Sequence, residues 1–358
     1  MKVSLAAVDL PEQSKKNLQE AIAEERIGQG KFIREFEEKF AEWNGSKYAV
    51  FVSNGTVADT LALWSIKDGR NEVILPAFTF VAQANSVIHA GLKPVFVDVD
   101  ERAQIDPNLI ERAITPNTLA IFPAHLLGRA ADMDTIKFIA EKCNLFVIED
   151  CCEALGAQWN KEKVGSIGDI GTFSFYASHH ITTGEGGMLT TNSKEIYDKV
   201  VSLRNHGRKS ENTLDLFQFE MIGFNSKGTN LQAAIGAGLV DKLDKIIETR
   251  RLNMKWLNKI LGLSWYDDVS KGYSSPHCYP LFTETPTQRD LKLMELEDKG
   301  IEARKLMACI PNKEQCPAYG EYEGTFPSAE KLGATGYYVP VHHLLTYEQL
   351  NYLSLCLL

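Results

Sequence analysis

The stretch YAVFVSNGTVADTLALWSI, residues 48–66, joins an apolar run to a helical pattern through a short polar break. We expect residues 48–53 to form a buried strand and the residues after the break to form a helix. The break contains Asn54, Gly55 and Thr56. Free N–H groups at a helix start, together with a hydroxyl, can bind an anion such as a phosphate, and the same residues also suit a simple N-cap.

Short apolar runs and helical patterns go on alternating through the first two thirds of the chain. The further runs that we expect as buried strands are residues 72–76, 93–99, 118–124 and 145–150. Alternation of this kind predicts βαβ units and therefore an α/β fold with a mostly parallel sheet covered on both faces. Ligands of such sheets bind beyond the carboxyl ends of the strands, so the residues directly after each strand are the first candidates for a site.

The pattern changes in the last third of the chain. A long helix is expected from near Thr229 through residue 257, and mixed strand, helix and loop patterns follow it until a closing helix near the C-terminus. We therefore predict a large domain over residues 1–250 and a smaller C-terminal α/β domain over residues 251–358.

The composition is that of an ordinary globular protein, with 358 residues of which 44% are hydrophobic and 24% charged. The formal net charge of −9 argues against nucleic acid as the main partner, because phosphate backbones attract clustered Lys and Arg. No apolar run approaches the roughly 20 residues that span a bilayer. The seven cysteines are odd in number and lack zinc or iron–sulfur spacing, which predicts reduced thiols in a cytoplasmic protein without a metal site.

Three further residues suit a planar, charged ligand. Asp150 ends the predicted strand 145–150, where its carboxylate could pair with a pyridine nitrogen or cap a helix. Phe80 could stack on a planar ring or belong to the core. Ser174 lies near the end of the strand-like segment GTFSF and could add a second hydroxyl to the phosphate site.

Seven motifs in the same order give the chain a nearly end-to-end resemblance to the DegT/DnrJ/EryC1/StrS family of sugar aminotransferases. These are fold-type I enzymes that use pyridoxal phosphate (PLP) on nucleotide-linked keto sugars. The motifs are GQGKFIREFEEKFAEWNGSKYAVFVSNGTVA, PAFTFVAQANSVIHAGLKPVFVDVD, FPAHLLGRAADMD, VIEDCCEALGA, GTFSFYASHHITTGEGGML, LRNHG and GFNSKGTNLQAAIG. The resemblance implies a large PLP-binding domain followed by a small one.

The resemblance also implies a cofactor site on particular residues of this chain. Gly55, Thr56 and Ser174 would hold the cofactor phosphate. Asn225 would reach the phosphate of the neighbouring subunit's cofactor, which implies a homodimer with shared active sites.

Three residues would contact the cofactor ring by the same resemblance. Phe80 would stack on the pyridine ring and Asp150 would pair with its nitrogen. Glu153 stands where the family often has Gln or His in contact with the ring hydroxyl.

The chain departs from the aminotransferases in the loop SFYASHHITTGEGG, residues 174–187. The family has a lysine five residues after the phosphate-binding serine, and this lysine bonds to the cofactor aldehyde and moves protons. Here that position is His179. Histidine cannot form a stable imine, but it can exchange protons because its unperturbed pKa is about 6.5. The site therefore keeps an acid/base group and loses the covalent tether.

Histidine at this position, followed by His180, resembles the sugar 3-dehydratase branch of the family. The resemblance implies a cofactor that works as pyridoxamine phosphate (PMP) and is regenerated from glutamate. His179 would then be the acid/base for loss of the C3 hydroxyl from a nucleotide-linked 4-keto-6-deoxyhexose. Closely spaced cysteines are missing, so we expect the type without an iron–sulfur cluster, like the GDP-4-keto-6-deoxymannose 3-dehydratases.

Two alternatives stay open. The chain could be a nucleotide-sugar 4-aminotransferase in which histidine replaces lysine, naturally or by engineering, because ITTGEGGML and GFNSKGTNLQAAIG are equally typical of aminotransferases. It could also be a non-catalytic homologue that binds cofactor or sugar. Arg304 could meet a substrate phosphate or carboxylate. Either enzyme would serve deoxysugar biosynthesis, as in the O-antigen of lipopolysaccharide.

Overall fold

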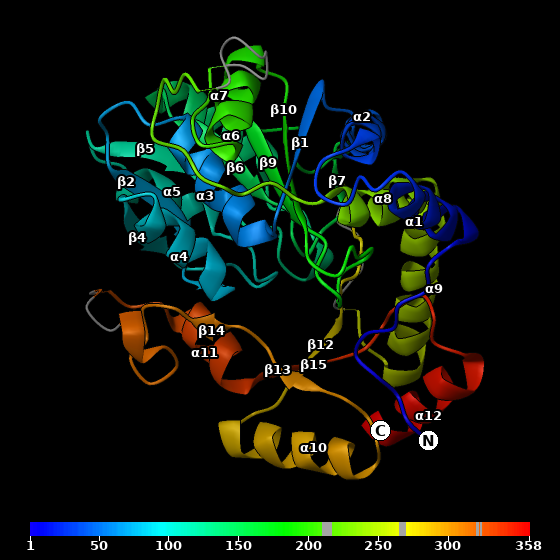
Figure 1. Cartoon of the computed structure of the whole chain (residues 1–358). Helices are drawn as coiled ribbons and strands as arrows, with labels where there is room; N and C mark the ends of the chain where they lie inside the picture. The colour runs from blue at the N-terminus through cyan, green and yellow to red at the C-terminus, as the bar shows by residue number, and fades with distance from the viewer. Residues whose placement is uncertain (210–216, 265–269, 320–321, 323) are drawn as a thin grey trace.

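A seven-stranded sheet forms the centre of the computed structural model, which describes residues 1–209, 217–264, 270–319, 322 and 324–358. Within the described residues the strand order is β1-β10-β9-β6-β5-β2-β4 (Figure 1). The strands are β1 (Tyr48–Val52), β2 (Glu72–Pro76), β4 (Lys93–Val97), β5 (Thr118–Ile121), β6 (Phe146–Asp150), β9 (Ile170–Ser174) and β10 (Gly187–Thr191). Among these seven, only β10 runs opposite to its neighbours, so the carboxyl ends of the other strands meet at one edge.

Helices cover both faces of this sheet, as the alternating pattern predicts. Alternate residues of β1 pack into different cores: Val50 and Val52 into one, Ala49 and Phe51 into the other. The first core is closed by α3 (Gly55–Ser65), α4 (Val81–His89) and α7 (Lys194–Arg204). The second is closed by α2 (Lys31–Asn44), α5 (Pro107–Ala113), α6 (Met133–Cys143) and α8 (Asn230–Leu239), and α1 (Glu12–Ala23) packs against α8.

The prediction of a single long helix that begins near Thr229 is wrong. The structure has α8, which ends at Leu239, then a 3-10 turn at Val240–Lys242, and then α9 (Leu243–Leu261). The break follows Gly236 and Gly238, in a stretch where helix propensity is low. Gly238 also lies against Ser14 of α1, so closely that a Cβ atom there would come within 2.5 Å of the Ser14 main-chain nitrogen.

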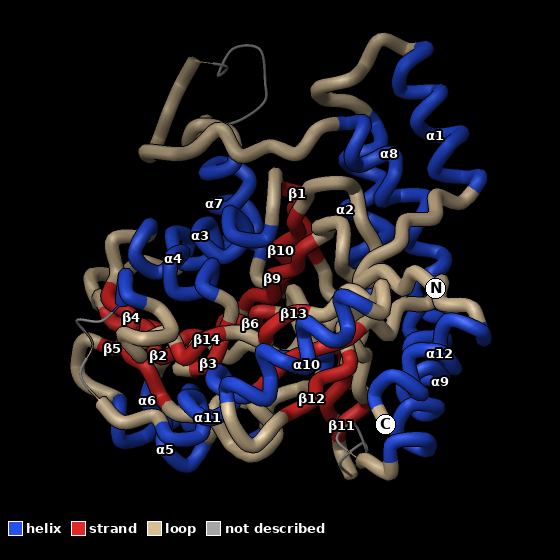
Figure 2. Tube along the Cα trace, turned by 90° about the horizontal axis from the view of Figure 1, so that it is seen from below, coloured by secondary structure: helices blue, strands red, loops and turns tan. Residues whose placement is uncertain are grey.

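The C-terminal part packs below the large sheet in Figure 1 and carries a second small sheet. That sheet has the order β12 (Tyr279–Phe282), β15 (Gly336–Val339), β13 (Arg304–Lys305). The helices α10 (Pro286–Asp298) and α11 (Pro327–Thr335) pack against it, and α12 (Tyr347–Leu357) packs against α9. Figure 2 shows the same elements from below. Because α9 runs across residue 250, the division into two domains at that residue stays a prediction.

Short strands connect these parts. β14 (Ala308–Cys309) pairs with β3 (Phe78–Thr79), which follows β2, and so ties the C-terminal part to the edge of the large sheet. β7 (Gln158–Trp159), β8 (Glu162–Lys163) and β11 (Gly272–Tyr273) form a further small sheet, and short 3-10 turns occupy Leu126–Gly128 and Pro317–Tyr319. In the part of the chain that the structure describes, no helix combines the length and the hydropathy needed to cross a membrane.

Candidate active site

A pocket of about 1050 Å³ opens at the carboxyl edge of the large sheet. Its wall includes residues at or just after the ends of β1, β3, β6 and β9, which is the expected place for a ligand in a sheet covered on both faces. The structure places every predicted site residue on this wall, namely Gly55, Thr56, Phe80, Asp150, Glu153, Ser174, His179 and Asn225.

The start of α3 and the end of β9 form the part of the pocket that suits a phosphate. Asn54 caps α3, because its Oδ1 accepts a hydrogen bond from the Val57 N–H at 2.9 Å. The first N–H groups of a helix have no acceptor inside the helix, so Gly55 and Thr56 can offer theirs to an anion. Ser174 lies directly beside Gly55 and adds a hydroxyl. The N-cap is thus observed, and it leaves the anion site intact.

Phe80 and Asp150 form the part of the pocket that suits a flat ring. The Phe80 side chain is 60% exposed and lines the pocket, so its face is open to a ligand and it is not a core residue. Asp150 is buried, and its Oδ1 accepts a hydrogen bond from the Cys152 N–H at 3.0 Å. Burial raises the pKa of the Asp150 carboxyl, and a neighbouring cation would lower it again. A protonated pyridine nitrogen supplies such a cation, so these residues fit the cofactor that the resemblance implies.

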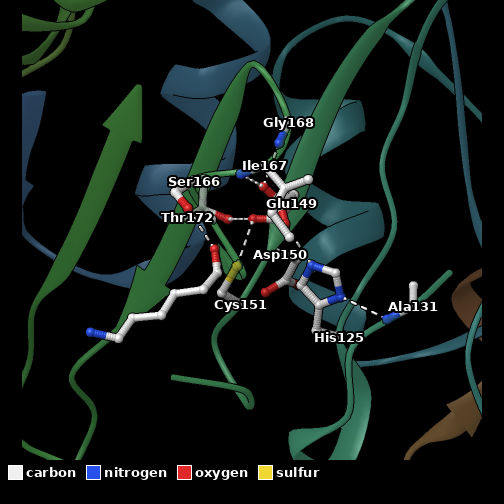
Figure 3. Close-up of polar contacts among 12 residues, drawn as sticks. His125, Ala131, Glu149, Asp150, Cys151, Ser166, Ile167, Gly168 and Thr172 are labelled. Carbon is white, nitrogen blue, oxygen red and sulfur yellow. Dashed lines mark hydrogen bonds and ion pairs between the residues drawn. The ribbon is translucent and has the colours of Figure 1, made fainter. Parts of the chain in front are cut away.

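A buried histidine, His125, lies beside Asp150 at the end of β6 (Figure 3). His125 Nε2 lies 3.0 Å from Glu149 Oε2, and His125 Nδ1 accepts a hydrogen bond from the Ala131 N–H at 3.1 Å. Because Nδ1 is an acceptor, this bonding pattern assigns the proton of the neutral ring to Nε2, which donates to Glu149. The main chains are joined too, since the His125 N–H donates to the Asp150 carbonyl at 2.9 Å. The network therefore fixes the end of β6 that carries Asp150.

Among the described residues, His125, Glu149 and Cys151 have donor atoms within 4.8 Å of one another, close enough to hold a metal ion. Their atoms already have partners. Glu149 Oε1 accepts hydrogen bonds from the N–H groups of Ile167 at 2.9 Å and Gly168 at 2.7 Å, and Cys151 Sγ lies 3.5 Å from the Glu149 carbonyl oxygen. Burial raises the pKa of the Cys151 thiol well above its ordinary value, which opposes the thiolate that metals bind. We therefore keep the prediction that the protein has no metal site.

Glu153 holds a strained turn at the pocket wall. Its Oε2 accepts a hydrogen bond from the Leu127 N–H at 2.9 Å, and Leu127 has a φ of 59°, in the left-handed region that leucine rarely adopts. Burial raises the pKa of Glu153 to about 7, the bond from Leu127 opposes this shift, and the charge of Asp150 adds to it. A contact between Glu153 and the ring hydroxyl stays a prediction.

His179 and His180 lie in the loop between β9 and β10, and their positions differ. His179 lines the pocket. His180 is buried, with its Nε2 3.0 Å from the Ser275 hydroxyl and 3.2 Å from the Ser275 carbonyl oxygen. Burial and then the charge of Arg250 lower the pKa of His179 to about 4. At neutral pH the imidazole that faces the pocket is therefore uncharged and able to accept a proton.

One lysine among the pocket-lining residues, Lys305 on β13, has its amine in an ion pair. Its Nζ lies 2.9 Å from Asp290 Oδ1. The position that carries the anchoring amine in the aminotransferases holds an imidazole in this chain. The geometry therefore agrees with a site in which the cofactor is held without a covalent bond to residue 179.

Sequence reasoning missed the wall that comes from the last third of the chain. His277, Lys305 and Tyr338 line the pocket, as does Arg304, which the sequence suggested only as a contact for substrate. The pairing of β13 with β15 and of β14 with β3 brings this segment to the sheet edge. No local pattern could have found these residues, because their positions depend on how the two parts of the molecule pack together.

Asn225 lines the pocket of its own chain, and its Oδ1 accepts a hydrogen bond from Lys227 Nζ at 2.6 Å. For Asn225 to reach a neighbouring subunit's phosphate, the pockets of two copies must face each other across their interface. The homodimer with shared active sites stays a prediction on these grounds.

The fold and the pocket define a class of enzyme, the fold-type I PLP-dependent transferases, with a seven-stranded and mostly parallel sheet. A family model described as the DegT/DnrJ/EryC1/StrS aminotransferase family matches residues 8–357. This chain belongs to that family.

Known relatives include two GDP-perosamine synthases. The one from Escherichia coli O157:H7 is 37% identical over 331 residues, covering 90% of this chain and 88% of that protein. The one from Caulobacter vibrioides is 38% identical over 328 residues, covering 88% and 86%. The solved structure of E. coli GDP-4-keto-6-deoxy-D-mannose-3-dehydratase with bound hydrated PLP superposes with a TM-score of 0.91 at 28% identity, covering all of both chains. The identities are thus higher toward the synthases than toward this dehydratase.

Proposed function

We propose that this chain transfers an amino group to a nucleotide-linked 4-keto-6-deoxyhexose, with PLP and PMP as the two forms of its cofactor and glutamate as the amino donor. The observation that carries this proposal is the identity of 37% and 38% to two GDP-perosamine synthases over nearly nine tenths of each chain. The pocket supports it, since it offers groups for a phosphate, a flat ring and a ring nitrogen in one cavity.

The cofactor, when bound, supplies an electron sink that stabilises negative charge on the carbon next to its nitrogen. The protein supplies the surroundings. The start of α3 and the Ser174 hydroxyl would hold the phosphate, the Phe80 face would hold the ring, and Asp150 would keep the ring nitrogen protonated. These contacts orient the reacting carbon without a covalent bond to the protein.

His179 would accept and return the proton that an aminotransferase lysine normally moves. The uncharged imidazole at neutral pH is the accepting form, and it lies on the pocket wall. A positioned acid/base group contributes roughly 10²–10⁴-fold to a reaction rate. The loss of the anchoring amine therefore leaves the proton-transfer part of the chemistry in place.

A second candidate function is C3 dehydration of the same class of sugar, and His179 is the observation that favours it. In the branch that this loop resembles, histidine replaces the lysine, and the glutamate half of the reaction is shared with aminotransfer. The two candidates differ in whether the sugar gains an amine at C4 or loses its C3 hydroxyl. The full-length superposition on the E. coli dehydratase is compatible with either.

Product analysis decides between these candidates. The PLP-loaded protein is incubated with glutamate and GDP-4-keto-6-deoxymannose, then with the CDP-, dTDP- and UDP-linked sugars, and products are identified by mass spectrometry. A 4-amino sugar supports the proposal, and a 3-deoxy-4-keto sugar with release of ammonia overturns it in favour of dehydration. Lack of turnover across the panel, with cofactor bound, indicates a non-catalytic homologue. His179→Asn is the control that should abolish either product.

A further inference from the structure

A buried guanidinium ties two loops of the pocket wall together. Arg250 of α9 is 2% exposed. Its Nη1 donates hydrogen bonds to the carbonyl oxygens of Pro276 at 3.2 Å and His277 at 2.9 Å, and its Nη2 donates to the His179 carbonyl at 3.2 Å. The loop after β9 and the segment before β12 are thus held by one side chain.

The rings carried by these two segments touch. The His179 and His277 ring centroids lie 5.0 Å apart with an interplanar angle of 78°, an edge-to-face arrangement. Both residues line the pocket and both are half-buried. In each ring Nδ1 is buried and, among the described residues, has no hydrogen-bond partner, so neither ring is oriented by a hydrogen bond at that atom. Each ring is instead restrained by packing, and the contact between His179 and His277 is shorter than the ring contacts of Tyr176 with His179 at 6.2 Å and of His180 with His277 at 6.3 Å.

We propose that His277 is a positioning residue for His179, and that it holds the imidazole which replaces the lysine in the orientation needed to exchange a proton with the bound cofactor and sugar. The role of His277 in catalysis rests on the proposed function. The contact between the His179 and His277 rings is observed whatever the function is. A lysine is held at its cofactor by a covalent bond, whereas an imidazole without such a bond needs contacts with other side chains to keep its orientation.

The protonation of the His277 ring depends on the charge of the His179 ring and of other nearby groups. His179 and His180 face it from the loop after β9, at ring distances of 5.0 and 6.3 Å, and Arg250 faces it from α9. Burial, then the charge of His179, then that of Arg250 lower the pKa of His277. His342 and His343, after β15, also have their pKa lowered by burial and by Arg250. A proton on one pocket imidazole therefore opposes a proton on the other.

The kinetic test compares His277→Ala with His277→Phe. Phenylalanine keeps a flat ring against His179 but cannot titrate, whereas alanine leaves the His179 ring unsupported. We expect His277→Ala to lower kcat by about 10–100-fold with KM little changed, because small misplacements of a reacting group cost this much. His277→Phe should recover kcat to within about threefold of the parent. His343→Ala, a change beside Arg250 but outside the pocket wall, should leave kcat unchanged.

A titration of the cofactor-free protein tests the ring contact without catalysis. Imidazole signals of His277 are followed by NMR against pH in the parent protein and in His179→Phe. We expect the pKa of His277 to rise in the variant, because the charge of His179 no longer opposes its protonation. An unchanged pKa overturns the contact, and a kcat of His277→Ala equal to that of the parent overturns the positioning role. Equal loss in the alanine and phenylalanine variants overturns positioning by packing. If the sugar panel gives no turnover, the titration still judges the contact, so the two proposals fail separately.

Discussion

Gly55 and Ser174 lie so close together that a Cβ atom added to Gly55 would come within 2.8 Å of the Ser174 Cβ. The same atom would lie 3.2 Å from the Cys152 Sγ. Gly55 starts α3 and Ser174 ends β9, so the close approach brings the first N–H groups of a helix and a hydroxyl to one point. A residue without a side chain lets these two groups lie this close together, as the phosphate site that we propose requires.

Gly55→Ala should therefore weaken cofactor binding. The added methyl group pushes Ser174 away from the helix start, and overpacking of this kind costs about 1–3 kcal/mol. If most of that cost falls on the bound state, the dissociation constant for PLP rises by about tenfold, since 1.4 kcal/mol is one factor of ten. The affinity is measured by absorbance titration of the cofactor-free protein.

Gly28→Ala is the matched control, because a Cβ atom on Gly28 meets nothing within 4 Å. It should bind PLP as the parent does. If Gly55→Ala binds PLP with unchanged affinity while remaining folded, the phosphate does not sit between α3 and Ser174.

Replacement by asparagine should affect turnover differently at Asp59 and at Asp150. Asp59 Oδ1 accepts a hydrogen bond from the Thr172 hydroxyl at 2.6 Å, and burial followed by the charge of Asp150 raises the pKa of Asp59 well above its ordinary value. Its raised pKa favours the protonated carboxyl, which asparagine resembles in shape and charge, so Asp59→Asn should keep turnover within about threefold. If Asp150 pairs with the ring nitrogen as we propose, Asp150→Asn removes that anion and should lower turnover roughly 10²-fold or more, on the scale of other well-placed electrostatic groups.

The measurement is the rate at which glutamate converts bound PLP to PMP, followed by absorbance, so that it does not depend on the sugar. Equal losses in the two variants would mean that the charge at the ring nitrogen is shared between both carboxyls. A larger loss in Asp59→Asn than in Asp150→Asn would contradict the assignment of Asp150.

The parts of the site that the strand pattern predicted, without the family resemblance, are those next to strand ends. Asn54, Phe80, Asp150 and Ser174 follow or end short strands, and parallel strands bring their carboxyl ends to one edge whatever their order in the sheet. The reversed direction of β10 was not predicted, since a short apolar strand carries no signal of its partner's direction. Its place between β1 and β9 is decided by tertiary packing.

The C-terminal wall of the pocket could not be predicted for a related reason. His277 stands in a segment that reads only as a strand, and its contact with His179 depends on Arg250 and on the path of α9. The same holds for Tyr338, whose strand β15 reaches the pocket by pairing with β13. The hydrophobic periodicity of a segment does not indicate which distant segment it contacts.

His179→Lys should restore a covalent bond to the cofactor. The side chain at 179 already lines the pocket, and a lysine there would stand where the aminotransferases have theirs. After borohydride treatment and unfolding, the variant should carry close to one PLP per chain, whereas the parent should lose its cofactor on dialysis. Mass spectrometry of the intact chain measures both.

Ser178→Lys is the control, because Ser178 lines the same pocket one residue earlier. It should retain much less cofactor than His179→Lys after the same treatment. Equal labelling of both variants would show that any amine on this wall reacts, and lack of labelling in His179→Lys would show that residue 179 does not reach the cofactor aldehyde.

The contribution of His342 to stability should be lost as the pH drops from about 6.5 to 4. Burial and the charge of Arg250 lower the pKa of His342 to about 4, against about 6.5 in an unfolded chain. Between these values the unfolded chain binds the extra proton, so acid favours unfolding. Glu153, with its pKa raised to about 7, acts in the opposite sense, because the folded state holds the proton and loses stability as the pH rises toward 7.

His342→Gln isolates the histidine contribution. The His342 Nε2–H donates to the Ser4 carbonyl at 3.0 Å, and Nδ1 accepts a hydrogen bond from the Leu344 N–H at 3.3 Å, which a proton on Nδ1 would break. Glutamine offers a donor and an acceptor but does not titrate. We expect Tm to fall less between pH 6.5 and 4.5 in this variant than in the parent, measured by calorimetry. His89→Gln, at an exposed position, should keep the parent's slope. An equal slope in His342→Gln would show that His342 is protonated in the folded protein without loss of stability.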